Sequence, residues 1–166
     1  MQIKLVVAGS RTVRCAGYVF QAIDEYLEEL GVTAEDQVEI VSGMASNGPD
    51  VIAVWYAAER GYPLKEFPAN WDELGKGAGM LRNSDMARYA THALIVWDGQ
   101  SNGTKDMMSK AAQYHLKTRI LQRPVLKMDE YYESKKGYSV RGLNGRKNYA
   151  GQSEQRPNPK RARWTN

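Results

Sequence analysis

Arg82 and the Gly103-Thr104 pair have residue types and a spacing that suit phosphate binding. They lie in the segment KGAGMLRNSDMARYATHALIVWDGQSNGTKDM, residues 76–107, which has the pattern of a helix, an apolar strand, a glycine-rich turn and a second helix. A guanidinium group can bind a phosphate through two parallel hydrogen bonds. The first N–H groups of a helix have no acceptor within the helix and attract anions. We therefore expect a phosphate or a nucleotide at one end of the sheet that contains this strand.

Two further glycine-bearing turns follow predicted strands, one at residues 9–11 and one at residues 42–50. In open parallel sheets, ligands bind beyond the carboxyl ends of the strands, where all three turns are expected to lie. Glycine in such turns allows positive φ and close approach of the backbone to a ligand. The candidate ligand-binding residues are Gly9, Ser10, Arg11, Ser42, Gly43, Asp50, Arg82, Asn83, Gly99, Ser101, Gly103 and Thr104.

Each of these candidates also has a plain structural interpretation. Arg82 could be a surface arginine that pairs with Asp85 or Asp72. Asp98 could act as a base or bind a ribose hydroxyl, but aspartate is also a common turn residue. Asp50 lies near a predicted helix start, where an acid more often complements the helix dipole than performs catalysis.

Two tryptophans near these turns, Trp71 and Trp97, could stack on a base. Trp97 also continues an apolar strand, which favours a place in the core.

The elements that must position these residues alternate between strand and helix patterns. We predict strands over 3–9, 37–43, 64–67, 92–99 and 118–122, helices over 17–31, 51–61, 80–90 and 104–117, and a loop over 68–79. This alternation predicts an α/β fold, a Rossmann-like parallel sheet with helices on both faces and a basic C-terminal tail.

The length of 166 residues suits one domain, which we place at residues 1–123. No apolar run approaches the roughly 20 residues of a membrane span, so no membrane contact is expected. The single cysteine, Cys15, is typical of a reducing compartment, and we expect a cytoplasmic protein. Cysteine and the two histidines have no metal-ligand spacing, and no cofactor is expected. GxGxxG and GxxxxGK[ST] motifs are absent from the sequence.

Residues 124–166 form a tail or arm in this interpretation, partly disordered or ordered by a partner. The part from 134 to 166 carries nine Lys or Arg residues and one acid, a net charge of +8. The rest of the chain carries a net charge of −4. An acidic body with a basic tail indicates that any nucleic-acid binding would involve residues 134–166.

The segments GSR (9–11), VSGMASNGPDVIAVWYA (41–57), PANW (68–71) and the run from 75 to 107 resemble the YspA-like members of the SLOG superfamily. The resemblance covers roughly residues 3–122. The superfamily includes the Lonely Guy phosphoribohydrolases, DNA-processing proteins, and sensor domains thought to bind nucleotide-derived signals in immune systems. The resemblance implies a Rossmann-like fold and a nucleotide-type ligand. It also suggests a phage or defence association and is compatible with a homodimer.

The hydrolases of this superfamily carry an arginine on the helix before a PGGxGTxxE turn, and Arg82 matches that arginine. Gly99, Gly103 and Thr104 resemble the turn, but Asp98 replaces its proline and Met107 stands at the catalytic glutamate. Asp106 lies one residue earlier, about 100° round the helix. The phosphate-binding residues therefore carry over and the catalytic carboxylate does not.

Three hypotheses follow from these observations. The first is a sensor or sequestering protein for a nucleotide or an ADP-ribose-like ligand. The second is a nucleotide N-glycosidase resembling the phosphoribohydrolases, in which Asp98, Asp50 or Asp106 would supply the carboxylate that an oxocarbenium-like transition state requires. The third is a nucleic-acid-binding protein that uses the basic tail.

Overall fold

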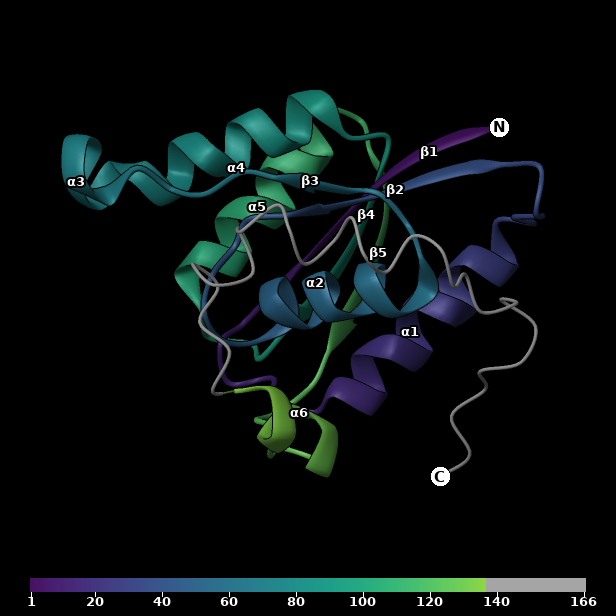
Figure 1. Ribbon diagram of the computed structural model, residues 1–166. Helices are drawn as coiled ribbons and strands as arrows, with labels where there is room; N and C mark the ends of the chain where they lie inside the picture. Colours follow the sequence, from purple (N-terminus) through teal and green to yellow (C-terminus); the bar gives the residue numbers. More distant parts are fainter. Residues whose placement is uncertain (137–166) are drawn as a thin grey trace.

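Five parallel strands form the sheet at the centre of the computed structural model, which describes residues 1–136 (Figure 1). Their order in the sheet is β3-β2-β1-β4-β5, and every pair of neighbours is parallel. The strands are β1 Gln2–Gly9, β2 Gln37–Ser42, β3 Leu64–Glu66, β4 His92–Trp97 and β5 Lys117–Gln122. The predicted α/β Rossmann-like fold is confirmed.

Helices connect the strands and cover both faces of the sheet (Figure 1). They are α1 Ala16–Glu29, α2 Pro49–Arg60, α3 Trp71–Leu74, the 3-10 turn η1 Gly75–Gly77, α4 Ala78–Tyr89, α5 Asn102–Gln113 and α6 Glu130–Lys135. One face of the sheet packs against α1, α2 and α6, and the other face packs against α4 and α5.

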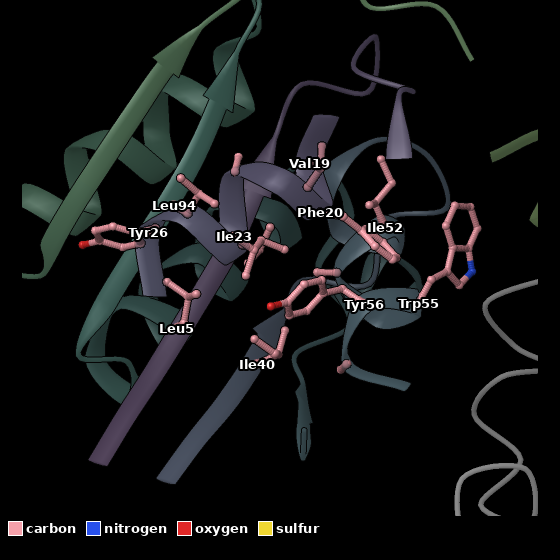
Figure 2. Packing of buried hydrophobic residues seen from close by; sticks show 14 of the residues in the cluster. Leu5, Val19, Phe20, Ile23, Tyr26, Ile40, Ile52, Trp55, Tyr56 and Leu94 are labelled. Atoms are coloured by element: carbon pink, nitrogen blue, oxygen red, sulfur yellow. The ribbon is translucent and has the colours of Figure 1, made fainter. Parts of the chain in front are cut away.

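The sequence of β1 shows why both faces are covered. Its side chains alternate between the faces, so Leu5 and Val7 lie in one apolar cluster and Val6 lies in the other. Figure 2 shows the larger cluster, in which Phe20 of α1 and Tyr56 of α2 are packed close to the sheet. A strand that is apolar on both faces must lie inside a parallel sheet, which places the turn after β1 at the middle of the carboxyl edge.

The predicted loop over residues 68–79 is wrong in part. From Trp71 onward it holds α3 and η1, and α4 begins at Ala78, two residues before the predicted start. The Asn70 side chain accepts a hydrogen bond from the Glu73 amide at 3.3 Å and so caps α3. A helix of four residues is too short to show an apolar period, so only the cap could have indicated it.

The packed structure does not end at the predicted boundary, residue 123. Leu126 forms a bridge with Val13, and α6 contacts α1. The Asp129 carboxylate caps α6 by accepting from the Tyr132 amide at 2.9 Å, and it also accepts from the Gly17 amide at 2.7 Å. Tyr132 is buried in the larger apolar cluster. The rest of the predicted tail, residues 137–166, lies outside the described residues.

No helix within residues 1–136 is long and apolar enough to cross a bilayer. In the same part of the chain, no group of three His, Cys, Asp or Glu side chains is placed to hold a metal ion.

Candidate functional site

The three predicted turns lie at the carboxyl edge of the sheet, because all five strands point in the same direction. The chain leaves β1 for β2 on one side and returns to β4 on the other. The neighbouring ends of β1 and β4 are therefore the point at which the strand order reverses, the usual place for a ligand in such sheets. The helices α2, α4 and α5 begin at this same edge, since each runs antiparallel to the strands.

Hydroxyl groups join the turn after β1 to the turn after β4. The Ser10 Oγ lies 3.3 Å from the Thr104 Oγ1, and it accepts a hydrogen bond from the Asp98 amide at 3.0 Å. The Thr104 hydroxyl also donates to the Ser101 Oγ at 3.1 Å. Both Ser10 and Thr104 are buried, so these contacts fix the two turns against each other.

The Asp98 carboxylate shapes the glycine-rich turn. It accepts hydrogen bonds from the amides of Gln100 (2.9 Å) and Ser101 (2.8 Å) and from the Thr12 hydroxyl (3.0 Å). Burial acts to raise the pKa of Asp98, but these donors outweigh it and hold the pKa below the ordinary value. Gly99 follows with a φ of 87°, which glycine adopts without strain. The geometry fits a turn residue better than a general base.

The Arg82 guanidinium is held in place by two of its three nitrogens. Nη1 donates to the Gly43 carbonyl in the turn after β2, and Nε donates to the Asn83 Oδ1 at 3.0 Å. Within residues 1–136, the third nitrogen, Nη2, has no hydrogen-bond partner. The structural interpretation in which Arg82 pairs with Asp85 is not observed, since Asp85 pairs with Arg88 at 2.7 Å instead.

Asn83 connects the arginine to the start of α5. Its amide nitrogen donates to the Gly103 carbonyl at 3.3 Å and to the Asp106 carboxylate at 3.0 Å. The side chain is buried, and its oxygen accepts from Arg82. Arg82 and the Gly103-Thr104 pair, far apart in the sequence, are therefore linked through one side chain, and Asp106 is held by the same amide.

Asp50 is a buried carboxyl beside the two arginines. Its Oδ2 accepts from the Ala45 amide at 3.2 Å, and its backbone carbonyl accepts from the Ser42 hydroxyl at 2.8 Å. Burial raises the pKa of Asp50 above the ordinary value, although the charges of Arg82 and Arg11 act to lower it. The Asp50 carboxyl therefore lies buried within the electrostatic influence of two arginines.

Two glycines bring the turns together. A Cβ at Gly9 would lie 2.3 Å from the Val96 carbonyl oxygen and 2.6 Å from Pro49 Cγ. A Cβ at Gly48, whose φ is 83°, would lie 2.7 Å from the Ser10 carbonyl oxygen. No larger residue fits at either position without backbone movement, so these glycines have packing roles.

The sequence reasoning missed the part that Tyr132 of α6 has in the site. Its hydroxyl accepts from the Gly48 amide at 3.1 Å and donates to the Asn47 side chain at 3.2 Å. The turn after β2 is therefore fixed from a segment that the sequence pattern placed in the tail. The signal available was an aspartate three residues before a tyrosine, which is a helix-cap pattern.

Three further residues singled out in the sequence have different environments in the structure. Arg11 is exposed, and its backbone carbonyl accepts from the Arg14 side chain at 3.1 Å. Met107, which stands at the position of the hydrolases' catalytic glutamate, is buried in the smaller apolar cluster. Its side chain therefore supplies no carboxylate to the site. Trp97 is half-buried and donates to the Ser101 carbonyl at 3.2 Å, which makes it part of the turn.

A comparison with family models bears on this arrangement. Residues 3–73 match the model named YAcAr, the YspA, cpYpsA-related SLOG family. Over these residues, the chain is similar to the YspA-like SLOG proteins. The predicted resemblance is confirmed. The matched SLOG residues include the turns after β1 and β2, whereas Arg82 and the glycine-rich turn lie beyond them.

Comparisons with curated proteins gave no match. Among solved structures, the chain is similar to a protein described as a predicted subunit of tRNA methyltransferase from Methanocaldococcus jannaschii. The two are 10% identical, the match covers 86% of this chain and 73% of that one, and the TM-score is 0.36. A likeness at that score carries no argument about this chain.

Proposed function

We propose that the carboxyl edge of the sheet binds a nucleotide or an ADP-ribose-like ligand through its phosphate, and that the protein acts as a sensor or sequestering protein. The observation that carries the proposal is the state of Arg82. Two of its nitrogens are tied to Gly43 and Asn83, which leaves Nη2 available in a fixed position. An arginine held in this way loses little conformational freedom when it binds a phosphate.

The start of α5 supports the same proposal. The first amide N–H groups of a helix lack intrahelical acceptors, and Ser101 caps only the amide of Thr104, with a distance of 3.5 Å. A Cβ at Gly103 would meet no atom within 4 Å, so packing does not require glycine there. Open space beside free amides and a nearby arginine suits a bound phosphate.

The replacement Arg82→Ala tests the phosphate contact. We expect it to weaken binding of AMP and ADP-ribose about tenfold or more, because a charge-assisted hydrogen bond of about 1.5–3 kcal/mol is lost. Calorimetric titration measures the affinities, and mass spectrometry of the bound fraction identifies the retained compound. Arg88→Ala is the matched control, since Arg88 lies on the same helix and pairs with Asp85 on the surface. Equal affinity of wild type and the Arg82 variant would show that the phosphate lies elsewhere.

Asp50 favours a second candidate function, nucleotide N-glycosidase activity. It is the predicted catalytic carboxyl whose pKa is raised by burial, and a raised pKa suits a group that exchanges a proton. The Asp98 carboxylate accepts from two backbone amides and the Thr12 hydroxyl, which hold its pKa below the ordinary value, and the Asp106 carboxylate accepts from Asn83. Release of free base from a nucleotide by wild type, and its loss in Asp50→Asn with binding retained, would establish this activity. Base release that survives Asp50→Asn would remove Asp50 from the mechanism.

Nucleic-acid binding is a further proposal that rests on the charge of residues 134–166. Most of that segment, 137–166, lies outside the described residues.

A further inference from the structure

Trp71 is a large aromatic side chain exposed beside the candidate phosphate site. It is the first residue of α3, a short turn that Asn70 caps and that projects beyond the sheet at the beginning of α4 (Figure 1). The residue is 49% exposed. About half of the indole is therefore accessible, and an aromatic face in water can stack on a planar group of a ligand.

Gly79 in the first turn of α4 sets the distance between Trp71 and Arg82. A Cβ at Gly79 would lie 3.2 Å from the Trp71 Cη2 and 3.7 Å from the Arg82 Nη2. The edge of the indole and the guanidinium Nη2, which has no hydrogen-bond partner within residues 1–136, therefore both lie close to Gly79. Glycine inside a helix costs stability relative to alanine, and here its bare Cα leaves room for the ring.

Trp71 lies against Gly79, on the same face of α4 as the candidate phosphate-binding residues Arg82 and Asn83. Gly79, Arg82 and Asn83 are three and four residues apart and share one face of the helix. The exposed apolar residues Met80 and Leu81 lie one and two positions after Gly79, and so about 100° and 200° away round the helix. Trp71 contacts the face that carries Arg82 and is not part of that outer apolar surface.

We propose that Trp71 is the stacking surface for the base of the nucleotide whose phosphate Arg82 binds, and that it favours purine nucleotides over sugar phosphates without a base. The inference rests on the proposed phosphate site. In a nucleotide, the sugar separates the base from the phosphate, so the two contacts must be close without coinciding, as Trp71 and Arg82 are. A purine gains more than a pyrimidine from a large aromatic ring because it covers more of the ring.

Titration of the full chain with AMP, ADP-ribose and ribose 5-phosphate tests the inference. We expect Trp71→Ala to weaken AMP and ADP-ribose about fivefold or more and to leave ribose 5-phosphate unchanged, because only the base contact is lost. Trp71→Phe retains a ring and should retain most of the affinity. Leu74→Ala is the matched control, since Leu74 lies in the same short helix, is also 49% exposed and should affect none of the three ligands.

The outcomes separate this inference from the proposed function. If Trp71→Ala binds AMP as tightly as wild type, or weakens AMP and ribose 5-phosphate equally, Trp71 does not contact the base and the inference fails. If Arg82→Ala has no effect while Trp71→Ala weakens AMP alone, the phosphate assignment fails and the base contact stands. If wild type binds neither AMP nor ADP-ribose, both are overturned.

Discussion

Gly43 lies between two side chains of opposite charge. A Cβ there would lie 2.8 Å from both the Arg82 Nη1 and the Asp50 Oδ2. The Arg82 guanidinium and the Asp50 carboxylate therefore occupy the space that a side chain at Gly43 would need. Gly103 is the opposite case, because a Cβ there would meet nothing within 4 Å.

These two glycines give a paired prediction. Gly43→Ala should displace Arg82, lower the free energy of unfolding by about 1–3 kcal/mol and weaken nucleotide binding. Gly103→Ala should leave the melting temperature unchanged or slightly higher, since alanine is the better helix former. It should still weaken binding, because the methyl group enters the space proposed for the phosphate. Denaturant unfolding and calorimetric titration measure the two effects, and unweakened binding by the Gly103 variant would contradict the assignment of that space.

Asp50 gives a prediction about pH. Burial raises the pKa of Asp50 in the folded protein above its ordinary value, which the unfolded chain retains. The stability that this group contributes is therefore fully present below its unfolded pKa and is lost as the pH rises through the folded pKa. Asp50→Asn cannot ionise, so its melting temperature relative to wild type should rise as the pH increases from about 4, the ordinary aspartate pKa, through the higher folded pKa.

Thermal melts at several pH values measure this difference. Asp85→Asn is the control, since Asp85 is exposed on the outer face of α4. A difference between Asp50→Asn and wild type that stays constant or falls as the pH rises would show that the carboxyl is stabilised as an anion.

At the scale of elements, α6 depends on one carboxylate. Asp129 accepts from the Tyr132 amide at the start of α6 and from the Gly17 amide at the start of α1. One side chain therefore satisfies amide donors at two helix starts and holds α6 against α1. Through the Tyr132 hydroxyl, the same attachment supports the turn after β2.

We expect Asp129→Ala to lower the free energy of unfolding by about 1–3 kcal/mol, because two buried or half-buried amides lose their acceptor. It should also weaken nucleotide binding modestly, since the turn that carries Gly43 loses part of its support. Denaturant unfolding and calorimetric titration check both effects. Glu130→Ala serves as the control, because its side chain is exposed in the same helix. An Asp129 variant as stable as wild type would mean that α6 is held by its apolar contacts alone.

At the scale of the whole molecule, the strand and helix patterns predicted the sheet because the three inner strands, β1, β2 and β4, carry apolar residues on both faces. The positions of the turns followed from the parallel sheet, because parallel strands share a direction and their carboxyl ends lie at one edge. The linking role of Asn83 and the support from Tyr132 could not be predicted in this way. Both depend on which side chains meet between elements distant in sequence, and a single sequence carries no periodic signal for such contacts.

The predicted loop over 68–79 is wrong in part because α3, capped by Asn70, is too short to show a periodic pattern. After residue 123, Tyr131 and Tyr132 pack against the core without a repeating pattern. In both places a helix-capping side chain, Asn70 or Asp129, was the local signal present in the sequence.

The hydroxyl contact between Ser10 and Thr104 joins residues 94 positions apart in the sequence. During synthesis, the turn after β1 is made first, but the Ser10 hydroxyl gains its Thr104 and Asp98 contacts only when β4 and the start of α5 have left the ribosome. Parallel pairings of this range are slow to form, because a long loop must close before any contact is gained. The contact between these two turns is thus completed late, and the proposed nucleotide binding would require four of the five strands of the sheet to be available.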